Sequence, residues 1–395
     1  MFSDGPGADN TAYTNYPGYL RGGAIHLQKL YEKNPATAFS AGPGSFGYYI
    51  LIHEISHAMG LKHPGNYNNS SSGLTGNPGD PPYLPFDKDN TRNTIMSYNA
   101  TYGPNGENPR SLMPYDIRAL QYLYGVRDDL SDGDNVYKFD RTNFNTVQTI
   151  WDSGGSDTLD FSALPANNVY SLDMNQGKPL TAKSALGGLR YYLQPSQLSP
   201  VGDRDRAFTV ETLLSPNILD RNRIYTTETF GTYIAFGANI ENLVGSPGND
   251  EAIGNELANS ILGGAGNDTI TGGRQSDTLD GGEGNDYLSG SKGLDVLTGG
   301  GGDDLLWGGQ GNDTIVGGFG RDRIVLELNG GMDTILDFAD GIDFLALAQG
   351  LRFEQLSIAP SANGTEIRFA STGQVLAMLP GIALSAIGQF DFSTV

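Results

Sequence analysis

The chain has 395 residues, no cysteine and a formal net charge of −21 at pH 7. The lack of cysteine excludes disulfides, thiolate zinc sites and cysteine nucleophiles, and the negative charge makes nucleic acid and anionic membranes poor partners. A chain of this length can form two or more domains, and its 56 glycines are about twice the usual share of ~7%.

The N-terminal residues 1–19 are polar and contain no apolar stretch of the kind found in signal peptides. We therefore expect no cleaved signal peptide. A short strand is predicted near Gly23–Leu27, and we interpret His26 as an ordinary strand histidine rather than a metal ligand. The longest apolar stretch, Val375–Ile387, is interrupted by proline and is shorter than the ~20 residues that span a bilayer, so we expect no membrane insertion.

The first predicted helix spans Ser45–Met59 and contains the sequence His-Glu-Ile-Ser-His. Its two histidines, His53 and His57, are four residues apart. Residues at this spacing share a helix face, so both imidazoles can bind one metal ion. Glu54 would then lie beside a water molecule on that ion.

A third histidine follows shortly after this helix. Gly60 can end the helix and turn the chain, so that His63 returns as a third metal ligand. Three neutral imidazoles leave one position open for water, which is typical of a catalytic zinc site rather than a structural one. Three of the four histidines of the chain belong to this one motif.

This pattern of three histidines and a glycine is that of the metzincin metalloproteases, and its surroundings resemble the serralysin family. Residues 64–68 resemble the sequence that follows the motif in serralysins, and Thr94–Tyr98 looks like the Met-turn of the family. The resemblance implies that Met96 forms an apolar floor under the zinc ligands. It also implies that Tyr98 binds zinc in the resting enzyme and stabilises the oxyanion during catalysis, while Glu54 is the general base. Met96 and Gly60 would be structural.

A second helix is predicted over Pro114–Tyr124, with Gly125 as its terminator, after a long loop over residues 64–93. It resembles the helix that follows the Met-turn in serralysins. Serralysins have a longer segment before the first histidine. Residues 1–127 are therefore expected to form a zinc metalloprotease domain that lacks the upstream strands of the family. Residues 128–244 alternate apolar and polar side chains and are expected to form a β-rich connecting region with a poorly ordered insertion at 194–206.

Nine consecutive units of nine residues follow, from Gly245 to Val325. The sixth position is aspartate in eight units and Asn259 in the second, while the eighth position is always apolar. A flexible glycine linker would not keep this phase. We therefore expect six-residue turns, in which glycine adopts positive φ, and three-residue strands with one inward side chain. Two units would form one coil of a parallel β-roll, with equivalent residues stacked 18 apart.

Stacked aspartates repel one another unless a cation lies between them. Carboxylate and glycine carbonyl oxygens suit Ca²⁺, and about five or six well-formed positions fit between the turns. We expect Asn259 to weaken the calcium position that pairs the second unit with the fourth. The predicted calcium ligands are Asp250, Gly263, Gly266, Asp268, Asp277, Gly281, Gly284, Asp286, Asp295, Gly299, Asp304, Gly308, Gly311, Asp313 and Asp322.

The repeat is similar to that of the RTX proteins. This resemblance implies secretion by a bacterial type I system, an uncleaved C-terminal signal and folding in external calcium, and hence an extracellular protein. Residues 326–395 are expected to form a C-terminal β region, and residues 390–395 partly resemble such a signal.

The sequence therefore predicts a multidomain protein. An α+β metzincin-like zinc protease domain precedes an all-β, calcium-binding parallel β-roll with flanking strands. The expected function is that of a secreted, calcium-stabilised zinc metalloendopeptidase. Its partners would be protein or peptide substrates and the type I secretion apparatus, and we expect a monomer. The alternative is a non-catalytic calcium-binding RTX surface or matrix protein derived from a truncated protease.

Overall fold

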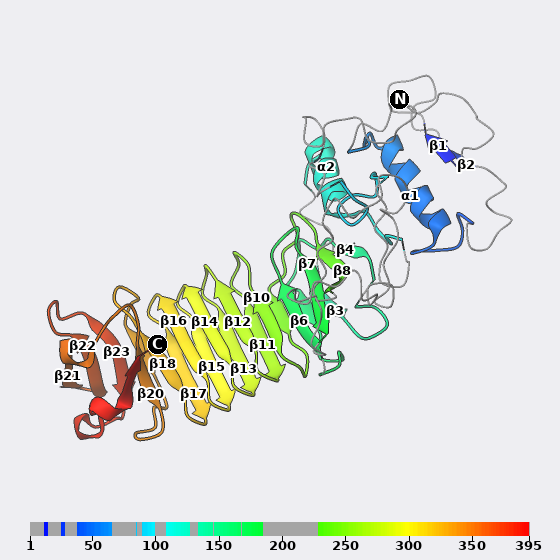
Figure 1. Cartoon of the computed structure of the whole chain (residues 1–395). Coiled ribbons are helices and arrows are strands. Elements are labelled where there is room, and N and C mark those ends of the chain that lie inside the picture. Colours follow the sequence, from blue (N-terminus) through cyan, green and yellow to red (C-terminus); the bar gives the residue numbers. More distant parts are fainter. Residues whose placement is uncertain are drawn as a thin grey trace, which may run out of the picture.

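The computed structural model describes residues 12–14, 25–27, 38–64, 84, 89–98, 108–126, 133–144, 146–166, 168–184 and 228–394. The expected insertion at 194–206 and most of the loop predicted at 64–93 lie outside these residues. Figure 1 shows two helices at one end of an elongated molecule and a long stack of strands that forms the rest. None of the helices within the described ranges combines the length and apolar character needed to cross a lipid bilayer.

Both predicted helices are present. Helix α1 (Phe46–Ala58) begins after Ser45, whose hydroxyl accepts a hydrogen bond from the backbone N–H of Tyr48 at 3.1 Å. The chain then turns at Gly60, which has a φ of +98°. Helix α2 (Pro114–Tyr124) has the predicted bounds, because proline is favoured in a first turn and a glycine with positive φ follows the helix.

A short antiparallel pair lies beside α1. Strand β1 (Ala12–Thr14) pairs with strand β2 (Ile25–Leu27), which confirms the strand predicted near this position. His26 is in β2, opposite Tyr13 in the register. Its interpretation as an ordinary strand residue stays a prediction.

Two eleven-stranded sheets form the long body of the molecule. The strands of the first sheet are β4 (Gln148–Ile150), β6 (Asn168–Asp173), β7 (Pro179–Ser184), β8 (Glu228–Ile234), β10 (Asp250–Ile253), β12 (Thr269–Gly273), β14 (Tyr287–Lys292), β16 (Leu305–Gln310), β18 (Arg323–Leu326), β20 (Phe344–Leu347) and β24 (Phe392–Thr394). The strands of the second are β3 (Val136–Lys138), β5 (Thr158–Asp160), β9 (Asn242–Val244), β11 (Ser260–Ala265), β13 (Thr278–Glu283), β15 (Val296–Gly301), β17 (Thr314–Phe319), β19 (Asp333–Ile335), β21 (Leu356–Ser361), β22 (Gly364–Phe369) and β23 (Val375–Pro380).

The nine units alternate between the two sheets, which confirms the parallel β-roll. Ile270 of β12 is in register with Leu288 of β14, so equivalent residues stack 18 positions apart as predicted. The eighth-position side chains point inward and form a continuous apolar column. The predicted strand length of three residues is wrong. Strands β10–β18 have four to six residues, because parallel pairing continues past the apolar position, as in Gly264 with Gly282.

The roll continues on both sides of the nine units. Strand β10 pairs in parallel with β6, and β9 pairs with β5, so the solenoid includes strands from the connecting region. At the other end β18 pairs with β20, β17 pairs with β19, and the antiparallel strands β21, β22 and β23 complete one sheet. Three short 3₁₀ helices lie in this C-terminal part, at Phe353–Gln355, Leu384–Ala386 and Gln389–Asp391.

A smaller core lies between the helices and the start of the roll. It contains Leu61, Ile95, Met96, Met113, Val147 and Tyr233, and it is separate from the main apolar column. Helix α1 contributes Tyr49 and Ile52 to its edge, and α2 contributes Leu120. This core holds the segment 94–98 against both helices and so determines where the histidines can meet. The metzincin-like nature of residues 1–127 stays a prediction.

Candidate metal centres

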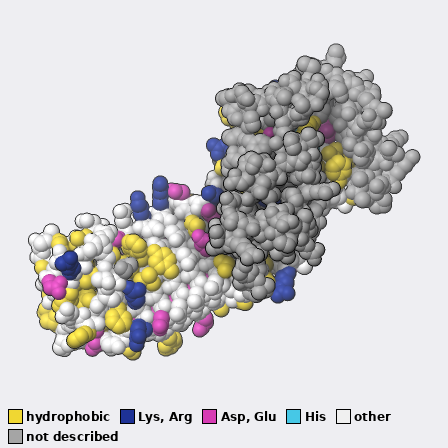
Figure 2. Space-filling model, viewed as in Figure 1, with side chains coloured by type: hydrophobic (Ala, Val, Ile, Leu, Met, Phe, Trp, Pro, Cys, Tyr) yellow, Lys and Arg dark blue, Asp and Glu magenta, His cyan; other side chains and the backbone are white. Residues whose placement is uncertain are grey.

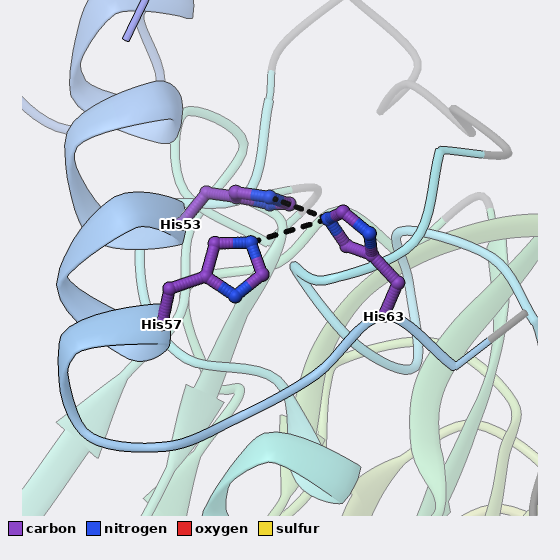
Figure 3. Close-up of side chains that lie close together, drawn as sticks. All are labelled: His53, His57 and His63. Carbon is purple, nitrogen blue, oxygen red and sulfur yellow. Dashed lines mark hydrogen bonds between the residues drawn. The ribbon is translucent and has the colours of Figure 1, made fainter. Parts of the chain in front are cut away.

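Three histidines converge at the C-terminal end of α1 (Figure 3). His53 and His57 come from the helix, and His63 returns from the turn that follows Gly60. The Nε2 atom of His63 lies 3.2 Å from Nε2 of His53 and 3.2 Å from Nε2 of His57. One nitrogen from each ring can be chosen so that all three lie within 4.8 Å of one another. The structure thus brings together the three histidines that the sequence predicts as zinc ligands.

Backbone carbonyls orient two of these rings. Nδ1 of His53 lies 2.7 Å from the carbonyl oxygen of Ile95, and Nδ1 of His57 lies 2.8 Å from that of Leu61. A carbonyl oxygen can only accept, so each Nδ1 carries the proton and each Nε2 presents its lone pair. Burial lowers the pKa of His53 to about 4 and that of His57 to about 3, so both rings are neutral near pH 7.

The donor set fits a zinc ion. With Zn–N bonds of about 2.0–2.1 Å, tetrahedral geometry separates two ligand nitrogens by about 3.3 Å. The Nε2 atom of His63 lies 3.2 Å from those of His53 and His57, which matches this value. Zinc binds the neutral form of imidazole, which burial favours here. Three such ligands leave one tetrahedral position for another donor.

Glu54 and Tyr98 lie at the same place in the fold. Glu54 follows His53 in α1, and only 4% of its surface is exposed. The Tyr98 ring centroid lies 4.2 Å from that of His63 and 6.0 Å from that of His53. Tyr98 is 52% exposed, so it borders the histidines from the solvent side. A buried carboxylate and a half-exposed phenol therefore flank the three imidazoles.

The segment that holds the Ile95 carbonyl is itself held by a buried carboxylate. Asp116, in the first turn of α2, accepts hydrogen bonds from the Thr94 hydroxyl at 2.5 Å and the Ile95 backbone N–H at 2.8 Å. It also accepts one from the backbone N–H of Met113 at 2.9 Å. Sequence reasoning did not assign Asp116 a role in the site. A carboxylate in the first turn of a helix was the available signal, but it indicates only a helix cap.

Met96 lies in the interior beneath this centre. It is 1% exposed and belongs to the smaller core together with Leu61 and Ile95. Since Ile95 and Leu61 also provide the carbonyl oxygens that accept from His53 and His57, the core packs directly behind the metal-facing rings. The apolar floor expected at Met96 is therefore consistent with its burial and neighbours.

The repeat turns contain a second set of oxygen ligands. Each aspartate from Asp268 onward accepts, through Oδ1, the backbone N–H of the sixth-position residue 18 earlier, as in Asp286 Oδ1 with Asp268 N at 2.7 Å. The Oδ2 atoms are buried and have no hydrogen-bond partner in seven of these residues: Asp268, Asp277, Asp286, Asp295, Asp304, Asp313 and Asp322. Although the net charge is −21, few acidic side chains appear on the visible face of the roll in Figure 2. Buried carboxylate oxygens without donors indicate a cation site.

Glycine keeps space open beside each of these oxygens. A Cβ atom on Gly281 would lie 2.3 Å from Oδ2 of Asp286 and 2.6 Å from the carbonyl oxygen of Gly299. A side chain there is excluded, and both oxygens face the same small space. The predicted ligands Gly263, Gly299 and Gly308 have the same relation to Oδ2 of the aspartate five residues later, and Gly266, Gly284 and Gly311 have positive φ in the turns.

Burial raises the pKa of these carboxyl groups. The pKa of Asp268 rises to about 8 and that of Asp277 to about 7, through desolvation and then through neighbouring carboxylates. A divalent cation would offset the cost of burying these carboxylates in their charged form, because it stabilises that form. The donor set therefore fits Ca²⁺.

The stacked acidic turns extend beyond the predicted ligands. Asp333 and Asp343 continue the two columns, since their Oδ1 atoms accept from the backbone of Asp313 and Asp322 at 3.1 and 3.0 Å. Before the repeat, Asp157 is also buried, with an Oδ2 atom that has no partner. None of these three aspartates was predicted as a ligand, because their spacing departs from nine residues. The partial unit Gly-Gly-Ser-Asp at 154–157 was the available signal.

The comparisons with known proteins bear on the repeat and on the family resemblance. A family model described as the RTX calcium-binding nonapeptide repeat matches residues 253–288 and 289–324. Serralysin C of Dickeya chrysanthemi is 33% identical over 198 residues, which are 45% of this chain and 38% of the relative. Serralysin of Proteus mirabilis is 35% identical over 146 residues, 33% of this chain and 28% of the relative.

Metalloprotease AprA of Pseudomonas entomophila (strain L48) is 30% identical over 284 residues, 66% of this chain and 47% of the relative. The chain thus spans less than half of the length of each of these relatives. The comparisons confirm the predicted resemblance: the chain is related to the serralysin-type metalloproteases and carries RTX calcium-binding repeats.

Proposed function

We propose that the protein is a zinc metalloendopeptidase that acts outside the cell and is stabilised by calcium. The observation that carries this proposal is the convergence of three imidazole Nε2 atoms beside Glu54 and Tyr98. The related proteins named serralysin and AprA support a protease at the level of the family.

His53, His57 and His63 would hold zinc through Nε2. When bound, zinc supplies a Lewis acid that lowers the pKa of water and polarises a carbonyl group. The carbonyl oxygens of Ile95 and Leu61 keep two of the rings in the required tautomer. Asp116 in turn fixes the Ile95 peptide, so α1 and α2 both contribute to the orientation of His53.

Glu54 would act as the general base. It takes a proton from the water molecule whose oxygen attacks the scissile carbonyl carbon, and it later gives that proton to the leaving amine as the C–N bond breaks. The Tyr98 hydroxyl would donate a hydrogen bond to the carbonyl oxygen as negative charge develops there. The half-exposed position of Tyr98 beside His63 suits a group that must meet a substrate.

We further propose that calcium fills the repeat turns and that the protein is exported by a bacterial type I system. Desolvated carboxylates in close columns make the calcium-free roll costly to fold. Calcium sites of extracellular modules fill only at about 10⁻⁴–10⁻³ M, so the roll would fold after export. We also propose that the substrates are proteins or peptides and that the protein is a monomer.

The experiment is hydrolysis of casein by the full chain in zinc and calcium, compared with Glu54→Gln. We expect the variant to keep its zinc and to lose about 10²–10⁴-fold in rate, the usual contribution of a general base. A zinc chelator should abolish the activity, and added zinc should restore it. If the full chain binds zinc, has a folded roll and yet cleaves nothing, the non-catalytic RTX binding protein is the better assignment.

A further inference from the structure

The nine repeat turns are of two kinds. In the first unit, Oδ2 of Asp250 accepts the backbone N–H of Ser246 at 2.6 Å, and Oδ1 accepts the Ser246 hydroxyl at 3.0 Å. In the second unit, Oδ1 of Asn259 accepts the backbone N–H of Asn255 at 2.8 Å. The seven later units have no such bond to Oδ2 of the sixth residue. Protein groups therefore bond both polar atoms of the sixth side chain in the first two units. In the other seven units, Oδ2 of the sixth side chain has no donor.

The Asn259 side-chain amide also donates to backbone carbonyl oxygens that a cation could otherwise bind. Its Nδ2 atom lies 3.3 Å from the carbonyl oxygen of Ile240 and 3.2 Å from that of Glu241. The opposite amide orientation would place Oδ1 against two carbonyl oxygens and Nδ2 against the Asn255 N–H, so the contacts define the orientation. An N–H donor thus meets carbonyl oxygens of the kind that calcium would otherwise bind.

The backbone conformation at the second residue divides the nine units into the same two groups. The second residue of each of the seven later units has a positive φ, between +73° and +150°. This holds even for Ser291, at +73°, where a side chain makes that conformation unfavourable. Ser246 and Asn255, the second residues of the first two units, do not have positive φ. Their backbone N–H groups are thereby free to turn toward their own sixth residue.

A further contact ties this coil to the residues before the repeat. Nδ2 of Asn255 donates to the carbonyl oxygen of Ile240 at 2.7 Å, beside the bond from Asn259. The backbone contact of the second unit with the fourth is kept, since Asn259 N donates to Oδ1 of Asp277 at 2.8 Å as in the other units. Asparagine in place of aspartate at the sixth position therefore changes only the side of the turn where a cation would bind.

We propose that the first coil of the repeat, residues 245–262, closes without metal, and that within the repeat the calcium positions begin at Asp268. This inference rests on the calcium binding proposed above and refines it. Hydrogen bonds from Ser246 and from the Asn259 amide replace calcium at the end of the roll nearest the helices. That end would then keep its turn structure at calcium concentrations that empty the other turns.

The test is the number of calcium ions bound per full chain at saturating calcium, measured by equilibrium dialysis for matched Asp→Asn variants. Asp250→Asn should leave the number unchanged, because an amide can keep both contacts with Ser246. Asp286→Asn should lower it by at least one, because its carboxylate has no protein donor at Oδ2. Circular dichroism at saturating calcium confirms that each variant is folded.

The outcomes separate the two proposals. If Asp250→Asn lowers the count as Asp286→Asn does, the metal-free coil is wrong and calcium binding stands. If Asp286→Asn leaves the count unchanged, calcium binding itself is wrong, and the inference is wrong with it. Crystals of the unaltered chain grown in calcium give a check without variants. A calcium anomalous peak on the side chain of Asp250 or Asn259 would overturn the inference, whereas peaks that begin only at Asp268 within the repeat would support it.

Discussion

The histidine centre and the calcium roll place their ligands by opposite means. In the roll, each carboxylate is positioned by its own nine-residue unit and the preceding coil, so the same contacts recur along the repeat. In the histidine centre, α1, the turn at Gly60, the segment 94–98 and α2 must all be in place. Loss of one roll ligand should therefore have a local effect, whereas loss of one contact behind the histidines should affect the whole centre.

Selective removal of each metal gives the largest expected contrast. We expect a zinc chelator to abolish peptide hydrolysis and to leave the β-sheet spectrum of the roll intact. Calcium removal with EGTA should instead melt the roll, because seven buried carboxylates lose their counter-ions. Hydrolysis and circular dichroism measured on the same samples check this. A zinc-free sample with an unfolded roll would show that the two regions depend on each other.

The pH dependence of the roll should reverse with calcium. Burial raises the pKa of Asp268 to about 8 and that of Asp295 to about 6 in the calcium-free fold, from an ordinary value near 3.8. A raised carboxyl pKa favours the protonated folded form, so stability without calcium falls as pH rises from about 4 to about 8. With calcium, acid should destabilise the roll, because protons compete with the ion. Thermal melts at pH 5 and pH 8, with and without calcium, test both signs.

A single core residue of the roll should have a large but local effect. Leu288 is fully buried between Ile270 and Leu306 of the neighbouring coils. Leu288→Ala should lower the free energy of unfolding by about 2–5 kcal/mol, through lost burial and a cavity. Thr278→Ala, on the exposed side of β13, is the matched control and should change it by less than about 0.5 kcal/mol. Urea unfolding in saturating calcium measures both, and hydrolysis should be unchanged in folded Leu288→Ala.

The smallest expected effect is at the support of the histidine centre. Asp116→Ala removes the acceptor of the Thr94 and Ile95 donors, so the Ile95 carbonyl behind His53 becomes less well positioned. We expect zinc affinity to fall about 10–100-fold, as for other groups that orient metal ligands. Competition with a fluorescent zinc chelator measures this, and exposed Asp340→Ala is the control. Unchanged affinity in folded Asp116→Ala would show that Asp116 only caps α2.

Local patterns predicted most of the elements. Helix α1 was predicted from its apolar spacing, and α2 from its proline and the glycine after it. The 18-residue register of the roll follows from the phase of its apolar positions. Strand length was predicted wrongly, because hydrogen bonding between coils continues into the glycines, and the pattern of side chains does not show this.

The sequence by itself determined most of the candidate metal ligands, because histidine spacing on a helix and aspartate spacing in a repeat are local properties. Only the tertiary structure decided which of them lack other partners. The Ile95 carbonyl reaches His53, and Asp116 reaches Ile95, through packing of segments far apart in the chain. Likewise, the contacts of Asn259 with residues 240–241 form only when coils stack. A hydrogen-bond partner depends on position in space, and spacing along the chain specifies that position only within one element or one repeating unit.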